Sequence, residues 1–276
     1  MSPAPELAAV YAGVAGASHP GNNARVREAL SAAVVPGVPV DVGSDMPSAL
    51  WSGTRGAPGI VLVAGTGATA YGEDGHGRTH RAGGWGYLIG DDGSGYALGR
   101  EAVRAICRQF DGAGRLTVLW EKLAAAHGLS DPLDIVPLVY GGDRPVFDRL
   151  VSLVLEAWRE GDPCAREAVE RVVEDQAALI RAVYRGLDFS GGPFTLVLRG
   201  GLLKPDCAIR PLLEAALQKS LSDASYRIDG EDAPPAFGAA LLALRLGGGL
   251  PEAAADTLLA AMRAAGLCPR PGRNQL

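Results

Sequence analysis

Three glycine-rich turns follow one another in the chain, and each could bind a polar ligand through its backbone. The first is Gly-Thr-Gly at 65–67, the second Gly-Gly-Trp-Gly at 83–86 and the third Gly-Asp-Asp-Gly-Ser at 90–94. Glycine tolerates positive φ angles and lets another group approach the backbone closely. Amides exposed in such a turn can face an anion, and the threonine hydroxyl adds a donor. One Gly-Thr-Gly alone is an ordinary turn, but the ordered set predicts a pocket built from loop backbone.

Apolar segments would position these turns. Residues 60–64, Ile-Val-Leu-Val-Ala, predict a buried strand that ends at the first turn, and a short loop rich in Gly and His is expected after it. The third turn opens a predicted amphipathic helix that continues to Phe110. Residues 194–198 predict another buried strand, which runs into Gly200 and Gly201. Because α/β folds bind ligands beyond the carboxyl ends of their strands, we expect these strand-end turns to converge.

Asp45 follows a short predicted strand at 38–42 and precedes a short helical segment at 46–51. Two interpretations fit this place. The carboxylate can cap the helix by accepting backbone N–H bonds, or it can act as a catalytic group at the carboxyl end of a buried strand. The two roles are compatible, because a capping carboxylate is held in one orientation.

The middle of the chain is dominated by helical patterns, which we expect to form an insert that serves mainly as scaffold. These patterns cover 116–127, 145–160 and 163–187. The last begins with Asp162 in the cap position and Pro163 in the first turn, as helix N-termini often do.

Composition narrows the class of protein. The chain has 276 residues, of which 47% are hydrophobic and 21% charged, so it can bury a core of one large or two small domains. A net charge of −5 gives no basic face, and nucleic acid is therefore not expected as the main partner. Four widely spaced cysteines predict a reducing compartment, where all four would be buried or incidental. Without a long apolar run, the chain is expected to be cytoplasmic, with no membrane partner.

Several common motifs are absent from the sequence. No G-x-x-x-x-G-K-[ST] occurs, which disfavours a P-loop nucleotidase, and no Gly-x-Ser-x-Gly supports a serine hydrolase. His76 and His80 lie four residues apart with Asp74 nearby. They fall between glycines in an expected turn without a third strong ligand, so we predict no intrinsic metal site.

Two segments, GIVLVAGTG at 59–67 and GGWGYLIGDDGSGYALGREAV at 83–103, carry a family resemblance. They resemble the N-acetylglucosamine kinase branch of the BadF/BadG/BcrA/BcrD ATPase family, within the sugar kinase–actin–chaperone superfamily. Three shorter segments also fit: VDVGSD at 40–45, LVLRGGL at 196–202 and PPAFGAA at 234–240. The resemblance covers about residues 8–246, most of the chain.

The resemblance implies an α/β, actin-like ATPase (ribonuclease H-like) fold with two lobes. The first lobe would be truncated and comprise residues 1–55 with a closing helix at 251–267. The second lobe, at 56–247, would carry the nucleotide- and sugar-binding loops and the helical insert. The implied reaction is ATP-dependent phosphorylation of an amino sugar, most simply N-acetylglucosamine or glucosamine. ATP and Mg²⁺ would be the cofactors, with the metal ion held mainly by phosphate and water oxygens.

The same resemblance implies a role for each matching residue. Asp45 would be the general base that accepts the proton of the sugar hydroxyl. The nucleotide side would consist of Gly65, Thr66, Gly67, Gly200 and Gly201. The sugar side would consist of Gly84, Trp85, Gly86 and Asp91.

Three departures from the family pattern qualify these expectations. The family's opening strand pair, with its D-G-G-G-T-K-T phosphate loop, has no counterpart here. Ala68 stands where the kinases more often carry serine, and Arg199 replaces a small residue, so that it would either reach the nucleotide or turn to solvent. We therefore expect residues 1–276 alone to be a weak or inactive kinase that associates through its first lobe, as a homodimer. The alternative is a non-catalytic sugar- or nucleotide-binding protein that lost its first phosphate loop.

Overall fold

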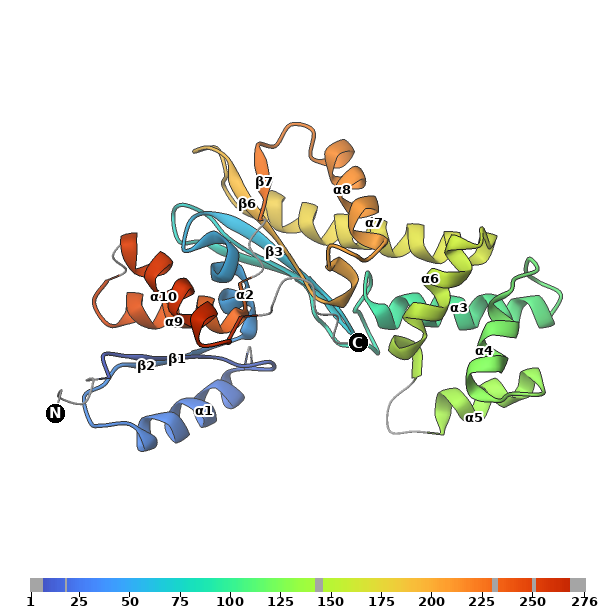
Figure 1. The fold of residues 1–276 in the computed structure, drawn as a ribbon, viewed down its shortest axis with the longest axis horizontal. Coiled ribbons are helices and arrows are strands. Elements are labelled where there is room, and N and C mark those ends of the chain that lie inside the picture. Colours follow the sequence, from blue (N-terminus) through green and yellow to red (C-terminus); the bar gives the residue numbers. More distant parts are fainter. Residues whose placement is uncertain (1–6, 18, 142–145, 230–232, 250–251, 269–276) are drawn as a thin grey trace.

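The computed structural model describes residues 7–17, 19–141, 146–229, 233–249 and 252–268. It contains two sheets of very different size (Figure 1). The larger sheet has five strands in the order β5-β4-β3-β6-β7, and the smaller one pairs β1 with β2. The strands are β1 (Val10–Gly13), β2 (Val40–Gly43), β3 (Gly59–Ala64), β4 (Ala68–Glu73), β5 (Thr79–Gly83), β6 (Phe194–Arg199) and β7 (Tyr226–Ile228).

Strand β3 is the centre of the larger sheet. It pairs antiparallel with β4 and parallel with β6, and five of its six residues are buried. The sequence of a strand covered on both faces is a continuous apolar run rather than an alternating one. For this reason, the apolar residues 60–64 predict β3 well. Strand β6 is buried in the same way, and both predicted strands are confirmed.

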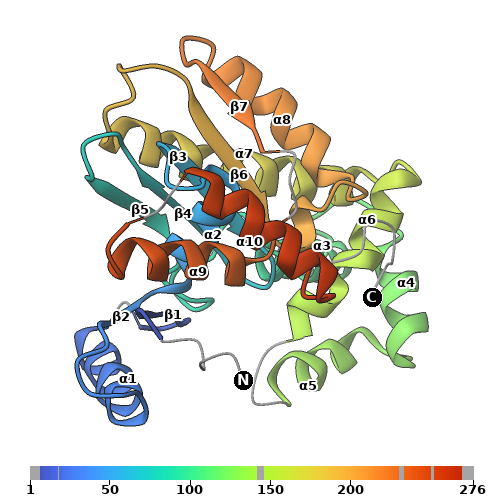
Figure 2. The ribbon, with the colours of Figure 1, turned by 60° about the vertical axis from the view of Figure 1, so that its left-hand side comes forward.

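Helices cover both faces of the larger sheet (Figure 2). One face packs against α7 (Pro163–Gly186), and the core continues outward into α3 (Gly95–Phe110) and α8 (Ile209–Ser220). The remaining helices on this side are α4 (Leu119–His127), α5 (Ile135–Tyr140), α6 (Val151–Arg159) and the short 3₁₀ helices η1 (Pro132–Asp134), η2 (Val146–Leu150) and η3 (Gly201–Leu203). Within the described residues, no helix is both long and apolar enough to cross a membrane.

The opposite face of the larger sheet has a separate core. It packs against α2 (Asp45–Thr54), and buried side chains of α9 (Pro235–Leu246) and α10 (Glu252–Ala264) complete the cluster around Val61 and Val197. Both α2 and α9 also contact β1, so these two helices lie between the two sheets. The domain division after residue 55 stays a prediction.

The smaller sheet is a parallel pair joined by a helix. β1 and β2 pair in register from Val10 with Val40 to Gly13 with Gly43, and α1 (Pro20–Ala33) forms the crossover. No residue of α1 is buried, because a two-stranded sheet offers this helix little surface to cover it. The strand predicted at 38–42 is confirmed as β2.

The expected loop after the first glycine turn is wrong. Residues 68–83 instead form the antiparallel pair β4 and β5, which extends the larger sheet. Along β4, buried residues alternate with partly exposed ones, which is the two-residue period of a strand. The many small and polar residues hide this period from a search for apolar runs.

Candidate functional site

The first glycine turn is a tight hairpin at the carboxyl end of β3. The Gly65 amide donates to the Gly67 carbonyl over 2.9 Å, and the Gly65 carbonyl accepts from the Gly95 amide at the start of α3 over 2.8 Å. The neighbouring parallel strand β6 ends beside it, and Gly200 has a φ of 99°. A Cβ atom on Gly200 would lie 2.3 Å from the Ala64 carbonyl oxygen, so only glycine fits.

The other two glycine-rich turns reach the same end of the sheet. β5 runs antiparallel to β4, and the second turn begins at the last residue of β5. The Gly84 amide donates to the Ala68 carbonyl over 2.9 Å. In the third turn, the Asp91 carboxylate accepts from the Ala68 amide over 3.4 Å. The buried Gln176 of α7 donates its side-chain amide to the Gly93 carbonyl over 2.8 Å and fixes this turn. The expected convergence of the turns is confirmed.

A cavity of about 520 Å³ opens where the first turn, α3 and the glycine pair after β6 meet. This volume lies within the roughly 300–1,000 Å³ that small-molecule sites usually occupy. Its walls come from the first turn and from segments far along the chain: Gly65, Thr66, Gly95, Asp148, Arg149, Val151, Ser152, Leu155, Gly201, Leu202 and Cys207.

The helical insert supplies much of this wall through η2 and α6, and its expected role as mainly scaffold is therefore incomplete. The Thr66 hydroxyl in the first turn donates to the Asp148 carboxylate of η2 over 3.1 Å. Asp148 could not be predicted from the sequence, because this contact joins residues 82 positions apart and no local pattern indicates it. Cys207 was expected to be buried or incidental, but it is only half-buried and lines the cavity. Cys107 is exposed.

Asp45 is the first residue of α2, and its side chain is exposed. The N-cap residue is Ser44, whose side chain forms no capping hydrogen bond, and the Asp45 carboxylate accepts none from the described residues. The interpretation of Asp45 as a mere helix cap therefore has no support. The short connection 55–58 joins α2 to β3, and the helix packs on that strand. The helix thus runs back along β3, which directs its first residue toward the end of the sheet that carries the glycine turns.

None of Gly84, Trp85, Gly86 and Asp91 lines the cavity. Trp85 is 68% exposed, and the Arg81 guanidinium lies 5.3 Å above the centroid of its ring. Asp91 instead lies against the outside of the first turn, where a Cβ atom on Gly67 would come within 3.0 Å of its carboxylate. The assignment of these residues to a sugar stays a prediction.

Arg199 does neither of the two things that the sequence suggested. Its guanidinium forms an ion pair with Asp229 at 2.7 Å, and the two side chains are only 11% and 7% exposed. It also contacts the Ser52 hydroxyl of α2 at 3.4 Å. Because a buried charge is tolerated when it is paired, Arg199 ties β6 to the segment after β7 rather than reaching the cavity or solvent.

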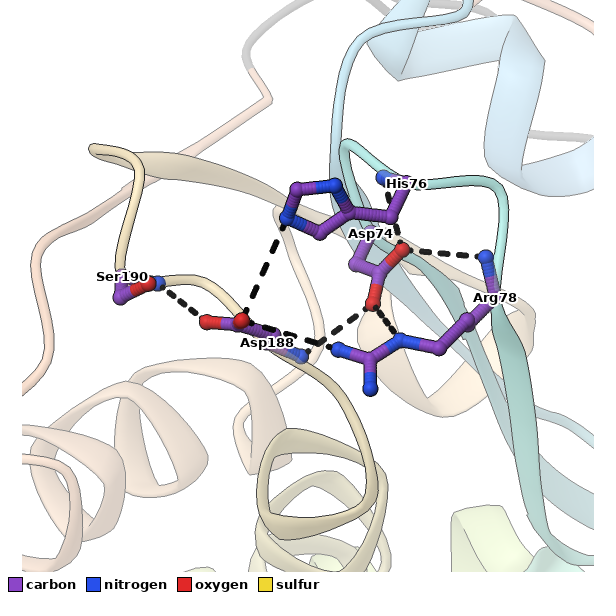
Figure 3. Close-up of polar contacts among 5 residues, drawn as sticks. All are labelled: Asp74, His76, Arg78, Asp188 and Ser190. Carbon is purple, nitrogen blue, oxygen red and sulfur yellow. Dashed lines mark hydrogen bonds and ion pairs between the residues drawn. The ribbon is translucent and has the colours of Figure 1, made fainter.

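The opposite end of the β4–β5 pair is held by Asp74, whose side chain is fully buried (Figure 3). It accepts hydrogen bonds from the backbone amides of His76 and Arg78 over 2.9 and 3.0 Å, and from the Arg78 guanidinium over 2.8 Å. The Asp188 amide, just past α7, donates to it as well. Burial alone would raise the pKa of Asp74, but these four donors outweigh it and lower the pKa to about 2.

This cluster has a structural rather than a metal-binding arrangement, since its one buried carboxylate already accepts four hydrogen bonds from protein donors. The His76 imidazole lies 4.0 Å from the Asp188 carboxylate. Among the described residues, no three His, Cys, Asp or Glu side chains gather as a group that could hold a metal ion.

Comparisons with known proteins give one matching family and several similar proteins. The model of the BadF/BadG/BcrA/BcrD ATPase family matches residues 4–243. The chain is 28% identical over 200 residues to the N-acetylmuramic acid/N-acetylglucosamine kinase of Clostridium acetobutylicum, covering 72% of this chain and 65% of that protein. It is 32% identical over 202 residues to the N-acetyl-D-glucosamine kinase of Dictyostelium discoideum, covering 71% and 62% respectively. The chain thus spans less than two thirds of either curated relative.

Solved structures show the same likeness in three dimensions. A candidate N-acetylglucosamine kinase from Chromobacterium violaceum matches with a TM-score of 0.63 and 27% identity, over 87% of this chain and 77% of that one. A second, from Porphyromonas gingivalis, matches in fold with a TM-score of 0.59 and 22% identity, over 85% and 76%. The expected α/β two-lobe fold of the actin-like ATPase type, with a helical insert, is confirmed.

Proposed function

Because the chain belongs to the BadF/BadG/BcrA/BcrD ATPase family, we propose that it transfers the terminal phosphoryl group of ATP to an amino sugar such as N-acetylglucosamine. One observation carries this proposal. A cavity of small-molecule size opens at the carboxyl ends of two adjacent parallel strands, beside a Gly-Thr-Gly hairpin that is packed onto a helix N-terminus. The names of the relatives, which are those of kinases, give no support to the alternative of a non-catalytic binding protein.

The nucleotide occupies the cavity in this proposal. Gly201 lines the cavity, and a Cβ atom on it would meet nothing within 4 Å, so the adenosine can approach the backbone closely. The Thr66 and Gly67 amides and the threonine hydroxyl hold phosphate oxygens, while Gly65, whose amide already donates to the Gly67 carbonyl, borders the phosphates with its backbone. Donors fixed in this way before the substrate arrives stabilise the charge that develops on the transferred group.

Magnesium fits this site as a companion of the phosphates rather than as an ion in a protein cage. The described residues hold no cluster of three potential ligands, but the cavity wall has one carboxylate, Asp148, directly beside the phosphate-binding turn. Mg²⁺ usually keeps several waters and binds through one or two carboxylates plus substrate phosphates. When bound, it would neutralise negative charge on the transferring phosphoryl group.

The acceptor sugar lies toward Asp45 and the second and third turns. Asp45 has an exposed carboxylate that no described neighbour occupies, and it takes the proton from the attacking hydroxyl. Trp85 offers an exposed ring face and Asp91 a carboxylate for the sugar hydroxyls, with Gly84 and Gly86 shaping the turn. Association of two copies remains part of this proposal and rests on the small sheet of the first lobe.

The test is transfer of a terminal phosphate label from ATP to N-acetylglucosamine, glucosamine or N-acetylmuramic acid by residues 1–276. Label in at least one sugar supports the function, and the ranking of the three identifies the acceptor. Binding of ATP without labelled sugar, even with the protein shown to be folded and at high enzyme concentration, would contradict a kinase and favour a binding protein. Asp45→Asn serves as the matched negative control.

A further inference from the structure

A buried ion pair joins α2 to β6. Arg199 is the last residue of β6, and its guanidinium binds the Asp229 carboxylate at 2.7 Å and the Ser52 hydroxyl of α2 at 3.4 Å. It also donates to the carbonyl of Leu198 in its own strand over 3.1 Å. One planar group thus contacts β6, α2 and the segment after β7.

The packing around this pair leaves α2 little room to shift. Asp229 is fixed to β6, since its amide donates to the Leu196 carbonyl over 2.8 Å. A Cβ atom on Gly53 of α2 would come within 2.7 Å of both the Asp229 carboxylate and the Val197 side chain. Ser52 beside it is fully buried. Helix α2 therefore lies directly against both β6 and the ion pair.

The two elements that the pair joins carry the two sides of the proposed reaction. Helix α2 begins with Asp45, the proposed base, and β6 leads into Gly200 and the cavity residue Gly201. Asp45 stands seven residues ahead of Ser52, which is about 10 Å of helix. A small tilt of α2 at Ser52 would therefore displace the Asp45 carboxylate relative to the nucleotide.

We propose that Arg199 is a positioning residue, which holds Asp45 in place relative to the nucleotide by fixing α2 against β6. The inference rests on the proposed function. A buried ion pair often adds little net stability, because the desolvation of two charges offsets their attraction. The planar guanidinium of arginine instead fixes geometry, since it binds its partners in few orientations. Misplacing a catalytic group by about 1 Å can lower a rate about 10²-fold.

A neutral pair of similar size separates positioning from stability. Arg199→Met with Asp229→Asn removes both charges and the contact with Ser52, while the net charge of the chain stays the same. The matched control is Arg181→Met with Glu174→Gln, because this ion pair at 2.6 Å joins two residues of α7. Arg199→Lys is a second variant in case the double one does not fold, since it keeps the charge but loses the planar fork.

The first measurement is steady-state phosphoryl transfer by the full chain with ATP, Mg²⁺ and N-acetylglucosamine, well below the melting temperature of every variant. In Arg199→Met/Asp229→Asn, we expect kcat to fall at least about tenfold, with both KM values within about threefold of the wild type. Arg199→Lys should show a smaller loss, and the control pair none. Titration with a non-hydrolysable ATP analogue counts the folded sites, so that a mere loss of folded protein is not taken for a loss of kcat.

The second measurement needs no turnover. When the analogue binds beside Gly201, we expect deuterium uptake by the backbone amides of residues 49–54 in α2 to slow at least about twofold in the wild type and in the control pair. In Arg199→Met/Asp229→Asn, the analogue should still bind but leave this uptake unchanged, because α2 is no longer fixed to β6.

Wild-type kcat in Arg199→Met/Asp229→Asn would overturn the inference, and so would equal protection of α2 by the analogue in that variant and in the wild type. An equal loss of kcat in the control pair would show a general effect of removing an ion pair and would overturn it too. If the folded wild type binds the analogue but transfers no phosphate, the proposed function fails, whereas the exchange measurement still decides whether Arg199 fixes α2 to β6. If it binds no nucleotide, both fail.

Discussion

Single residues decide what the first glycine turn and the glycine pair after β6 can do. The first turn was predictable, because a β-branched run followed by Gly-Thr-Gly is a local pattern, and so was the pair Gly200 and Gly201. The contacts of Asp148 and Arg199 were not predictable, because each joins residues distant in the sequence. Their partners can be identified only once the helical insert and the larger sheet are in place.

We expect Asp45→Asn to lower phosphoryl transfer by roughly 10²–10⁴-fold, the usual loss when a general base is removed. Binding of sugar and nucleotide should stay nearly unchanged, since the amide has the same shape and Asp45 has no described partner to lose. Steady-state kinetics and calorimetry on the same preparation measure both. Full turnover in the variant would show that Asp45 is not the base.

The two neighbours Gly200 and Gly201 should respond differently to alanine. At Gly200 a Cβ atom would meet the Ala64 carbonyl oxygen at 2.3 Å, and the φ of 99° is strained for any side chain. We expect Gly200→Ala to cost at least about 2 kcal/mol of unfolding free energy.

At Gly201 a Cβ atom would meet nothing within 4 Å, and it would project from a residue that lines the cavity. Gly201→Ala should therefore leave the unfolding free energy within about 0.5 kcal/mol of the wild type while weakening nucleotide binding. Denaturant unfolding and titration distinguish the two effects. Equal stabilities for the two variants would contradict the close approach of Gly200 to β3.

At the scale of elements, β3 and β6 were predictable because they are buried on both faces. Helix α7 was predictable to within one residue of its end, because Asp162 and Pro163 mark its N-terminus. The β4–β5 pair was missed because its strands are held by pairing and by Asp74 rather than by an apolar run. Asp74 closes the far end of this pair and links it to the end of α7 (Figure 3).

The low pKa of Asp74 gives a pH-dependent contribution to stability. Because the pKa is lowered from its ordinary 3.8 to about 2 in the folded chain, the contribution is complete above about pH 4 and is lost as the pH falls toward 2. Asp74→Asn should lower stability at neutral pH and flatten the stability profile in this window. Urea unfolding at several pH values measures it, with Asp223→Asn, the same change at an exposed aspartate, as control. An unchanged acid slope would mean that the four donors do not favour the ionised carboxylate.

At the scale of the whole molecule, two cores lie on opposite faces of one sheet, and α2 with α9 connects that sheet to the small one. The two helices cross very closely. A Cβ atom on Gly238 of α9 would lie 1.9 Å from the Ser48 carbonyl oxygen of α2.

Glycine to alanine inside a helix normally stabilises by about 0.5–1 kcal/mol. At Gly238 we expect the opposite sign, a loss of about 1–3 kcal/mol, because the helices must move apart. Gly21→Ala in α1 is the matched control, since its Cβ atom would make only ordinary contact with His19 at 3.4 Å. Thermal and chemical unfolding measure whether Gly238→Ala lowers or raises the unfolding free energy. A stabilised Gly238→Ala variant would contradict the packing of α9 on α2.

The most direct test of the proposed function follows the terminal phosphate of ATP. The full chain is incubated with terminally labelled ATP, Mg²⁺ and N-acetylglucosamine, and the label is traced to sugar or to inorganic phosphate. We predict labelled sugar, at a rate lowered roughly 10²–10⁴-fold by Asp45→Asn and reduced by Gly201→Ala. Label found only in inorganic phosphate, or sugar labelled equally by all three proteins, would contradict a kinase that uses this cavity and Asp45.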